Sequence, residues 1–186
     1  MTIPQAGASA TSPMRRRLTI LAAALFGLSV IGALVVVMGF PIAFHVARIE
    51  GQAMSPTLRD QDRLLVDLWA YRATRPGRGD IVMMRYPRDA SRLFVKRVIA
   101  EPGEQLHIRD GHVFVDGTPL DESYVLPAFR SHDDWGPETV PQDSYFVMGD
   151  RRNNSSDSRH WGFVPAAYIV GRVTFRWFPF GEMQQF

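Results

Sequence analysis

The sequence places a lysine inside a short apolar run, where its amine can become desolvated. In FVKRVI (Phe94–Ile99), alternate side chains of a strand face opposite sides, so Lys96 shares a face with Phe94 and Val98. A lysine at a sheet edge keeps its ammonium in water. On a covered face, desolvation lowers the pKa of the amine, and a neutral Lys96 can accept a proton. A Ser–Lys hydrolase requires such a base.

A second polar stretch, GDRRNNSSDSRHWGFVP (Gly149–Pro165), carries three candidate partners for that lysine. Ser155, Asp157 and Arg159 are spaced by two, so they share one side if the segment is extended. The acid and the base can then pair, and the hydroxyl can orient a buried amine. These residue types are also typical of an ordinary loop.

Other uses of the same stretch are less favoured. Arg151 and Arg152 put positive charge where a calcium ion would bind. A catalytic triad of Asp157, Ser158 and His160 is only weakly indicated, because side chains so close in sequence rarely point to one place. The remaining histidines lack metal-ligand spacing: His45, His107, His112 and His132. We therefore expect no metal and no cofactor.

A third stretch, GQAMSPTL, can form a turn at a cleft. Gly51 and Pro56 flank Gln52-Ala53-Met54-Ser55, and such a turn can present a side chain and a free backbone N–H. By itself it is only a turn between strands.

Together, four stretches in chain order resemble the boxes of the type I signal peptidase family: GQAMSPTL, RGDIVMM, FVKRVIAEPGE and GDRRNNSSDSRHWGFVP. The resemblance runs from about Glu50 to the C-terminus and includes a preceding anchor. It implies a membrane-anchored β domain, a Ser–Lys dyad and cleavage of secretory signal peptides after a small-x-small pattern. The implied partners are signal peptides of exported preproteins and the lipid bilayer.

The resemblance also implies roles for particular residues. Lys96 matches the general base and Ser155 the hydroxyl that orients it. The supporting residues are Gly149, Asp150, Asp157 and Arg159, the last two as an ion pair. The nucleophile loop comprises Gly51, Ala53, Met54, Ser55 and Pro56. Arg151 departs from the family's more usual Asn.

Ala53 stands at the nucleophile position, and alanine has no oxygen with which to attack. Losing the nucleophile should remove most of the rate of peptide hydrolysis. Ser55 is displaced by ~6.6 Å along an extended chain, too far to replace it easily. Three readings stay open: an engineered inactive peptidase, a natural pseudo-peptidase that binds exported or membrane proteins as an assembly subunit, and a variant that uses another hydroxyl.

A membrane anchor precedes these motifs. Residues 18–44 contain no charge, and a helix of that length reaches ~40 Å, more than the ~30 Å hydrocarbon core. A cleaved signal has a shorter apolar region, about 7–15 residues. Three arginines at 15–17 predict a cytoplasmic tail (1–17) and an extracytoplasmic domain (45–186) on a bacterial inner (plasma) membrane. The start, residues 1–13, is small and polar, which indicates disorder.

After the anchor the periodicity becomes two, which predicts a mainly β domain of antiparallel sheet or partial barrel. Runs at 62–71, 79–87, 93–100, 143–150 and 168–180 are typical of strands, and 105–120 of a hairpin turning at Asp110-Gly111. Residues 131–142 are polar, which indicates a loop or an insertion. Aromatic and apolar residues fill the core or rest on the lipid interface: Leu68, Trp69, Tyr71, Trp177 and Phe178.

The composition excludes some kinds of site and partner. The 186 residues include no cysteine, which excludes disulfides and Cys-ligated metals. The net charge is only +2, with cations scattered among acids, so nucleic acid is not an expected partner.

Overall fold

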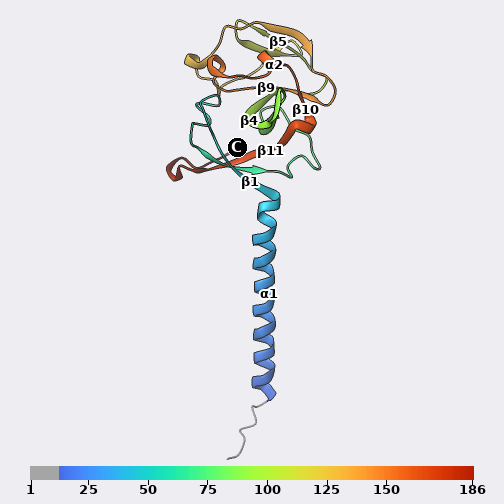
Figure 1. Cartoon of the computed structure of the whole chain (residues 1–186), viewed down its shortest axis with the longest axis vertical. Coiled ribbons are helices and arrows are strands. Elements are labelled where there is room, and N and C mark those ends of the chain that lie inside the picture. The colour runs from blue at the N-terminus through green and yellow to red at the C-terminus, as the bar shows by residue number, and fades with distance from the viewer. Residues whose placement is uncertain (1–12) are drawn as a thin grey trace, which may run out of the picture. The chain divides into compact units, whose positions relative to one another are not determined.

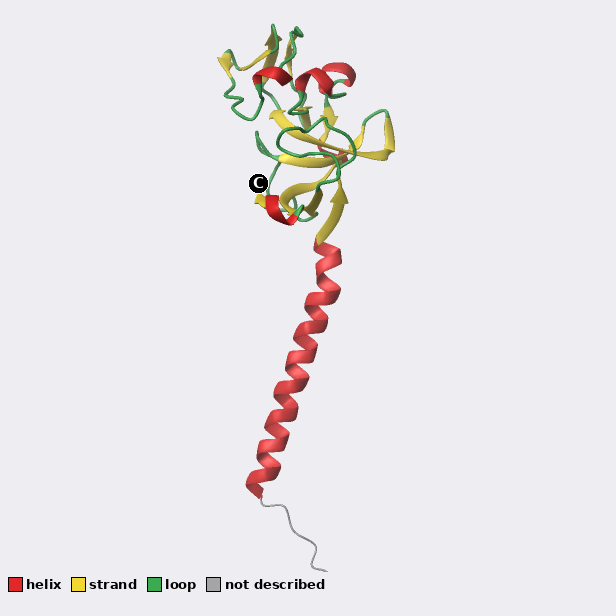
Figure 2. Cartoon of the chain, turned by 90° about the vertical axis from the view of Figure 1, so that its left-hand side faces the viewer, coloured by secondary structure: helices red, strands yellow, loops and turns green. Residues whose placement is uncertain are grey.

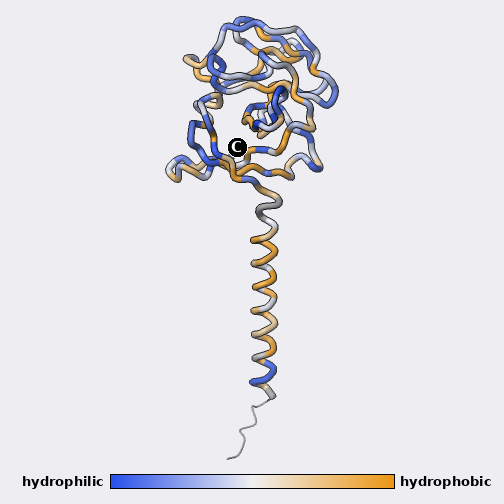
Figure 3. Tube along the Cα trace, viewed as in Figure 1, coloured by the Kyte–Doolittle hydropathy of each residue, from blue (hydrophilic) through white to orange (hydrophobic). Residues whose placement is uncertain are grey.

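The computed structural model describes residues 13–186 and divides into two compact units, residues 1–42 and 43–186. The first contains a long helix, α1 (Pro13–Ala43). Its stretch Met14–Gly39 is long and apolar enough to cross a membrane, as its hydropathy colouring shows (Figure 3). The helix begins before the expected anchor and includes the three arginines. The expected disorder of the first residues falls largely outside the described part, which begins at Pro13.

The second unit is built on strands (Figures 1 and 2). Its larger sheet has the order β1-β2-β11-β3-β4-β9-β10, with β12 beside β11, and all its pairings are antiparallel. The strands are β1 (Phe44–Arg48), β2 (Arg63–Asp67), β3 (Ile81–Tyr86), β4 (Asp89–Ala100), β9 (Ser144–Met148), β10 (Val164–Pro165), β11 (Ile169–Phe178) and β12 (Gln184–Gln185). The predicted mainly antiparallel β fold with an N-terminal apolar helix is confirmed.

A smaller antiparallel sheet has the order β7-β6-β5-β8. Its strands are β5 (Gln105–Arg109), β6 (His112–Val115), β7 (Thr118–Pro119) and β8 (Trp135–Thr139). The predicted hairpin turn is present, since Asp110 and Gly111 have φ of 47° and 72°.

The expectation that residues 131–142 form only a polar loop is wrong. They contain β8, which pairs with β5 through Trp135 and Ile108. The Trp135 ring packs on Phe146 and Phe163. One half-buried aromatic residue packs against the core and holds a strand whose other side chains are exposed, and alternation in the sequence could not reveal that.

Helices in the second unit are short. They are η1 (Pro127–Phe129), η2 (Arg152–Asn154), α2 (Ser158–Trp161), η3 (Ala166–Tyr168) and η4 (Phe180–Glu182). Two of them, η2 and α2, lie within the polar stretch Gly149–Pro165 identified from the sequence.

Three clusters of buried apolar side chains form the core. The cluster beneath the GQAMSPTL loop includes Met54 and Leu58, both nearly inaccessible to solvent. These two side chains therefore fasten the loop to the sheet. Of the aromatic residues that the sequence left open between the core and the lipid interface, Tyr71 packs on the core, whereas Trp69 is 45% exposed.

Candidate functional site

Lys96 lies in β4, an interior strand of the larger sheet between β3 and β9. Its side chain is buried, with a residue exposure of 3%. Burial lowers the pKa of the amine from 10.5 to about 8, although the charges of Asp157 and Asp150 act in the opposite direction. Its Nζ donates a hydrogen bond of 2.8 Å to Oγ of Ser155. A substantial fraction of this lysine is thus neutral near pH 8.

Ser155 follows η2 in an extended conformation and is itself buried. Gly149 is the common neighbour of this serine and of the GQAMSPTL loop. A Cβ added at Gly149 would overlap both the Ser155 hydroxyl and the Ala53 carbonyl oxygen. The glycine is therefore required for close approach rather than for backbone freedom, and it allows positions 53 and 155 to meet.

Asp157 and Arg159 form a two-pronged ion pair, with Nε–Oδ1 and Nη2–Oδ2 distances of 2.8 and 2.9 Å. Burial alone raises the pKa of Asp157, but hydrogen bonds from Arg159 and from the Gly149 N–H outweigh it and hold that pKa below its usual value. The pairing predicted from the sequence exists. The extended segment predicted to create it does not, because Arg159 lies in α2 and Asp157 caps that helix.

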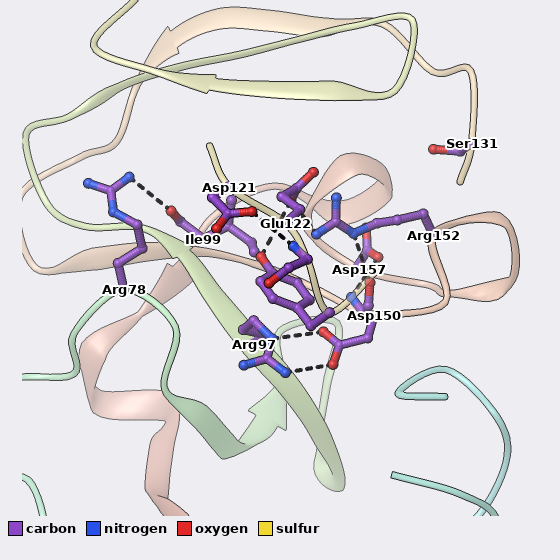
Figure 4. Close-up of polar contacts among 12 residues, drawn as sticks. Arg78, Arg97, Ile99, Asp121, Glu122, Ser131, Asp150, Arg152 and Asp157 are labelled. Atoms are coloured by element: carbon purple, nitrogen blue, oxygen red, sulfur yellow. Dashed lines mark hydrogen bonds and ion pairs between the residues drawn. The ribbon is translucent and has the colours of Figure 1, made fainter. Parts of the chain in front are cut away.

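Asp150 joins the lysine strand to the GQAMSPTL loop. Arg97 donates to its two oxygens over 2.8 and 2.7 Å (Figure 4). The Thr57 hydroxyl donates to one of them over 2.5 Å. Arg97 follows Lys96 in β4, so the two side chains point to opposite faces. One strand thus supplies both the buried amine and the cation that fixes its surroundings.

A buried ion pair extends this network. Arg152 donates to Glu122 over 2.5 Å and, through Nε, to the Gly149 carbonyl over 3.0 Å (Figure 4). The ring of Tyr124 lies under the Arg97 guanidinium. Sequence reasoning missed several members of this network: Thr57, Arg97, Glu122 and Tyr124. Two features of the sequence could have indicated this network: the acid next to Gly149, which is Asp150, and the cation next to Lys96, which is Arg97.

The GQAMSPTL loop is held by its own backbone. Gly51, at φ of 95°, donates to Asp60, and the N–H of Ser55 donates to the Gln52 carbonyl. The Ala53 carbonyl accepts from the N–H of Arg151 at 3.0 Å. The Arg151 side chain also donates to Gln52 and lies over the ring of Phe129.

Ala53 and Lys96 line the same cavity, of about 480 Å³. Met54, Ser156 and the segments 48–51 and 92–95 complete its wall. Ser55 and Pro56 do not contribute to it, and the closest acceptor of the Ser55 hydroxyl is the carbonyl of Leu58, at 3.5 Å. Within residues 13–186, the Ala53 N–H donates to no protein acceptor. The site therefore combines a neutralisable amine, an orienting hydroxyl and a free N–H.

A β domain with a buried, hydroxyl-bonded lysine beside a cavity is the arrangement of a hydrolase that uses an amine base. The sequence model of the signal peptidase family, peptidase S26, matches residues 20–178. The chain belongs to this family.

Named relatives agree with that assignment. A signal peptidase I of Leptolyngbya laminosa is 41% identical over 84% of this chain and 81% of its own length. A probable signal peptidase I-2 of Synechocystis sp. is 39% identical over 82% and 72%. The signal peptidase I T of Bacillus subtilis is 37% identical over 76% and 78%. A crystal structure of a signal peptidase I from Enterococcus faecalis, 33% identical, covers 54% of this chain and 98% of its own with a TM-score of 0.48.

Proposed function

We propose that this chain binds the signal peptides of exported preproteins in the cavity between Ala53 and Lys96. The observation that carries the proposal is the 2.8 Å hydrogen bond from the buried Lys96 amine to Ser155, at the wall of a cavity that Ala53 also lines. The relatives named signal peptidase I supply the substrate class.

The cavity suits an extended peptide. On one side, the Leu93–Val95 part of β4 pairs with β3 and, within residues 13–186, has no partner strand on its other edge, because β9 pairs with residues 97–100. On the other side, the described strands pair with β1 through β2 alone, and β1 leads into Ile49–Gly51. A substrate strand can add to such open edges through backbone hydrogen bonds.

The chemistry follows from the positions of the groups. With a serine at position 53, the neutral Lys96 amine takes the proton from its hydroxyl as the oxygen attacks the scissile carbonyl. The free N–H of residue 53 donates to the developing oxyanion. Lys96 then returns the proton to the leaving amine. Alanine at position 53 has no attacking oxygen, so the chain as it stands binds the peptide without hydrolysing it.

The hydroxyls of Ser55 and Ser155 are poor substitutes. The side chain of Ser55 lies outside the cavity, and Ser155 is already engaged by Lys96. These contacts favour a peptidase site without its nucleophile over a variant that uses Ser55 or Ser155. If the chain is instead an assembly subunit, it binds the same peptide, but the Lys96 amine has no catalytic role.

The proposed location follows from α1. The helix stretch Met14–Gly39 spans a bacterial plasma membrane, with its N-terminal arginines at 15–17 on the cytoplasmic side and residues 45–186 outside. The bilayer is then a partner as well as a location. The substrate, anchored by its own apolar segment, meets the site in two dimensions.

The test compares the chain as it stands with Ala53→Ser on a preprotein in liposomes. We expect cleavage by the serine form alone, and its loss when Lys96→Ala is added. Equal cleavage by both forms would overturn the assignment of position 53. Binding of the preprotein without cleavage by either form would instead favour the assembly-subunit reading.

A further inference from the structure

A second cavity adjoins the first. It measures about 650 Å³ and is lined by Arg130–Asp133, Arg152–Ser156 and His160. Ser156 lines both cavities, and Ser155 forms part of the second wall. A peptide that fills the first cavity and passes position 53 therefore has a continuous path along Ser156 into the second.

The wall of the second cavity is preformed. Arg159 donates to the Ser131 hydroxyl over 3.0 Å and pairs with Asp133. Asn153 donates to the Ala128 carbonyl over 3.0 Å, which ties η1 to the loop that carries Ser155. The segment 127–133 is thus fixed by side chains to the loop that carries Ser155, and its residues need little reordering on binding.

One cation of this wall has no ion-pair partner among the described residues. Arg159 pairs with both Asp133 and Asp157, and the buried Glu122 pairs with Arg152. In the part of the chain that the structure describes, the half-buried Arg130 guanidinium has no acidic partner. The Nη1 of Arg152 is also buried without a hydrogen-bond acceptor. The Arg130 guanidinium and the Arg152 Nη1 are therefore available to an anionic group of a ligand.

We propose that the second cavity receives the residues that follow the scissile bond and that Arg130 selects an acidic side chain among them. This inference rests on the proposed function, since it needs a peptide in the first cavity. A guanidinium binds a carboxylate through two parallel hydrogen bonds, so an arginine favours Asp or Glu over a neutral isostere. Arg130 acts here on specificity and takes no part in bond cleavage.

The test uses two preproteins that share one signal peptide and differ only by Glu or Gln at one of the first four mature positions. In the Ala53→Ser background we expect kcat/KM to favour Glu by roughly 5-fold to 20-fold at the position that reaches Arg130. Arg130→Gln should bring the ratio close to one, and Arg130→Glu should reverse it. Arg75→Glu is the matched control, because Arg75 is 75% exposed and lines neither cavity.

A second readout does not depend on hydrolysis. The unaltered chain, with Ala53, should bind the Glu preprotein more tightly than the Gln one by a similar factor, and only while Arg130 is present. If the serine form cleaves both substrates equally at all four positions, this inference fails and the proposed function stands. If cleavage never occurs but the Arg130-dependent binding preference does, the proposed hydrolytic chemistry fails and this inference stands. If the chain binds neither preprotein, both fail.

Discussion

The Nζ of Lys96 donates to the Ser155 hydroxyl over 2.8 Å, and both side chains are buried. A neutral amine has one lone pair, and the bond to Ser155 uses an N–H rather than that lone pair. Ser155 therefore fixes the direction in which the base accepts a proton. Buried in this way, the amine is a better base at moderate pH than an exposed lysine, whose pKa is near 10.4.

This geometry predicts the pH dependence of the restored peptidase. Lys96 has a pKa of about 8, so below that pH the fraction of neutral amine falls tenfold per unit. For Ala53→Ser, kcat/KM should rise with pH and level off above about 8. A profile that stays flat between pH 5 and 9 would show that Lys96 is not the base.

The charge of Asp157 raises the pKa of Lys96. Asp157→Asn in the Ala53→Ser background should therefore shift the profile to lower pH, in addition to any loss of rate. The measurement is the midpoint of kcat/KM against pH, which a purely structural defect would leave in place.

The buried amine should also reduce stability. At 1.36 kcal/mol per pKa unit, a pKa lowered from 10.5 to about 8 corresponds to about 3 kcal/mol, present in full below pH 8. Lys96→Met removes this penalty but leaves Ser155 without its donor, so we expect a gain of about 1–3 kcal/mol at pH 7 by urea unfolding.

The sign of the pH dependence distinguishes this cause from better packing. The folded pKa lies below the unfolded one, so between about pH 8 and 10.5 the unfolded state binds more protons. The stability of the unaltered chain should rise across that window relative to Lys96→Met, and the advantage of the variant should fade. A constant advantage over the whole range would contradict the account.

Ser155→Ala should lower kcat of the Ala53→Ser form by about 10-fold to 100-fold with little change in KM, because the hydroxyl orients the base and does not line the first cavity. Ser123→Ala, at an exposed position, is the control. An equal loss in both variants, or an effect of Ser155→Ala on KM alone, would argue against the orienting role.

Gly149→Ala should lower both stability and activity more than one added methyl group usually does. The added methyl would overlap the Ser155 hydroxyl and the Ala53 carbonyl. We expect a loss of about 1–3 kcal/mol in unfolding free energy and a larger loss of activity, since both sides of the site must move. Gly181→Ala is the control, because its Cβ would meet no atom within 4 Å. Comparable unfolding midpoints for the two variants would refute the packing argument.

Local sequence patterns determined much of this protein. The uncharged run predicts a long apolar helix, alternation predicts the strands around Leu65 and Val82, and Asp110-Gly111 predicts its hairpin turn. These features depend on side chains a few residues apart and on backbone preferences that glycine and aspartate carry with them. The four motifs in order likewise indicated the family.

Only the tertiary structure decided what surrounds those residues. From the sequence alone, Lys96 could lie at a solvent-exposed sheet edge or on a buried face. The pairing of β4 with β3 and β9 places it inside the sheet, where it is buried. Lys96 and Ser155 are 59 residues apart. Their contact, the bridge from Thr57 through Asp150 to Arg97, and the packing of Trp135 in β8 on Phe146 all depend on contacts between distant segments. Burial and electrostatic environment are properties of that packing, so the lowered pKa of the lysine could not be read from the residues beside it.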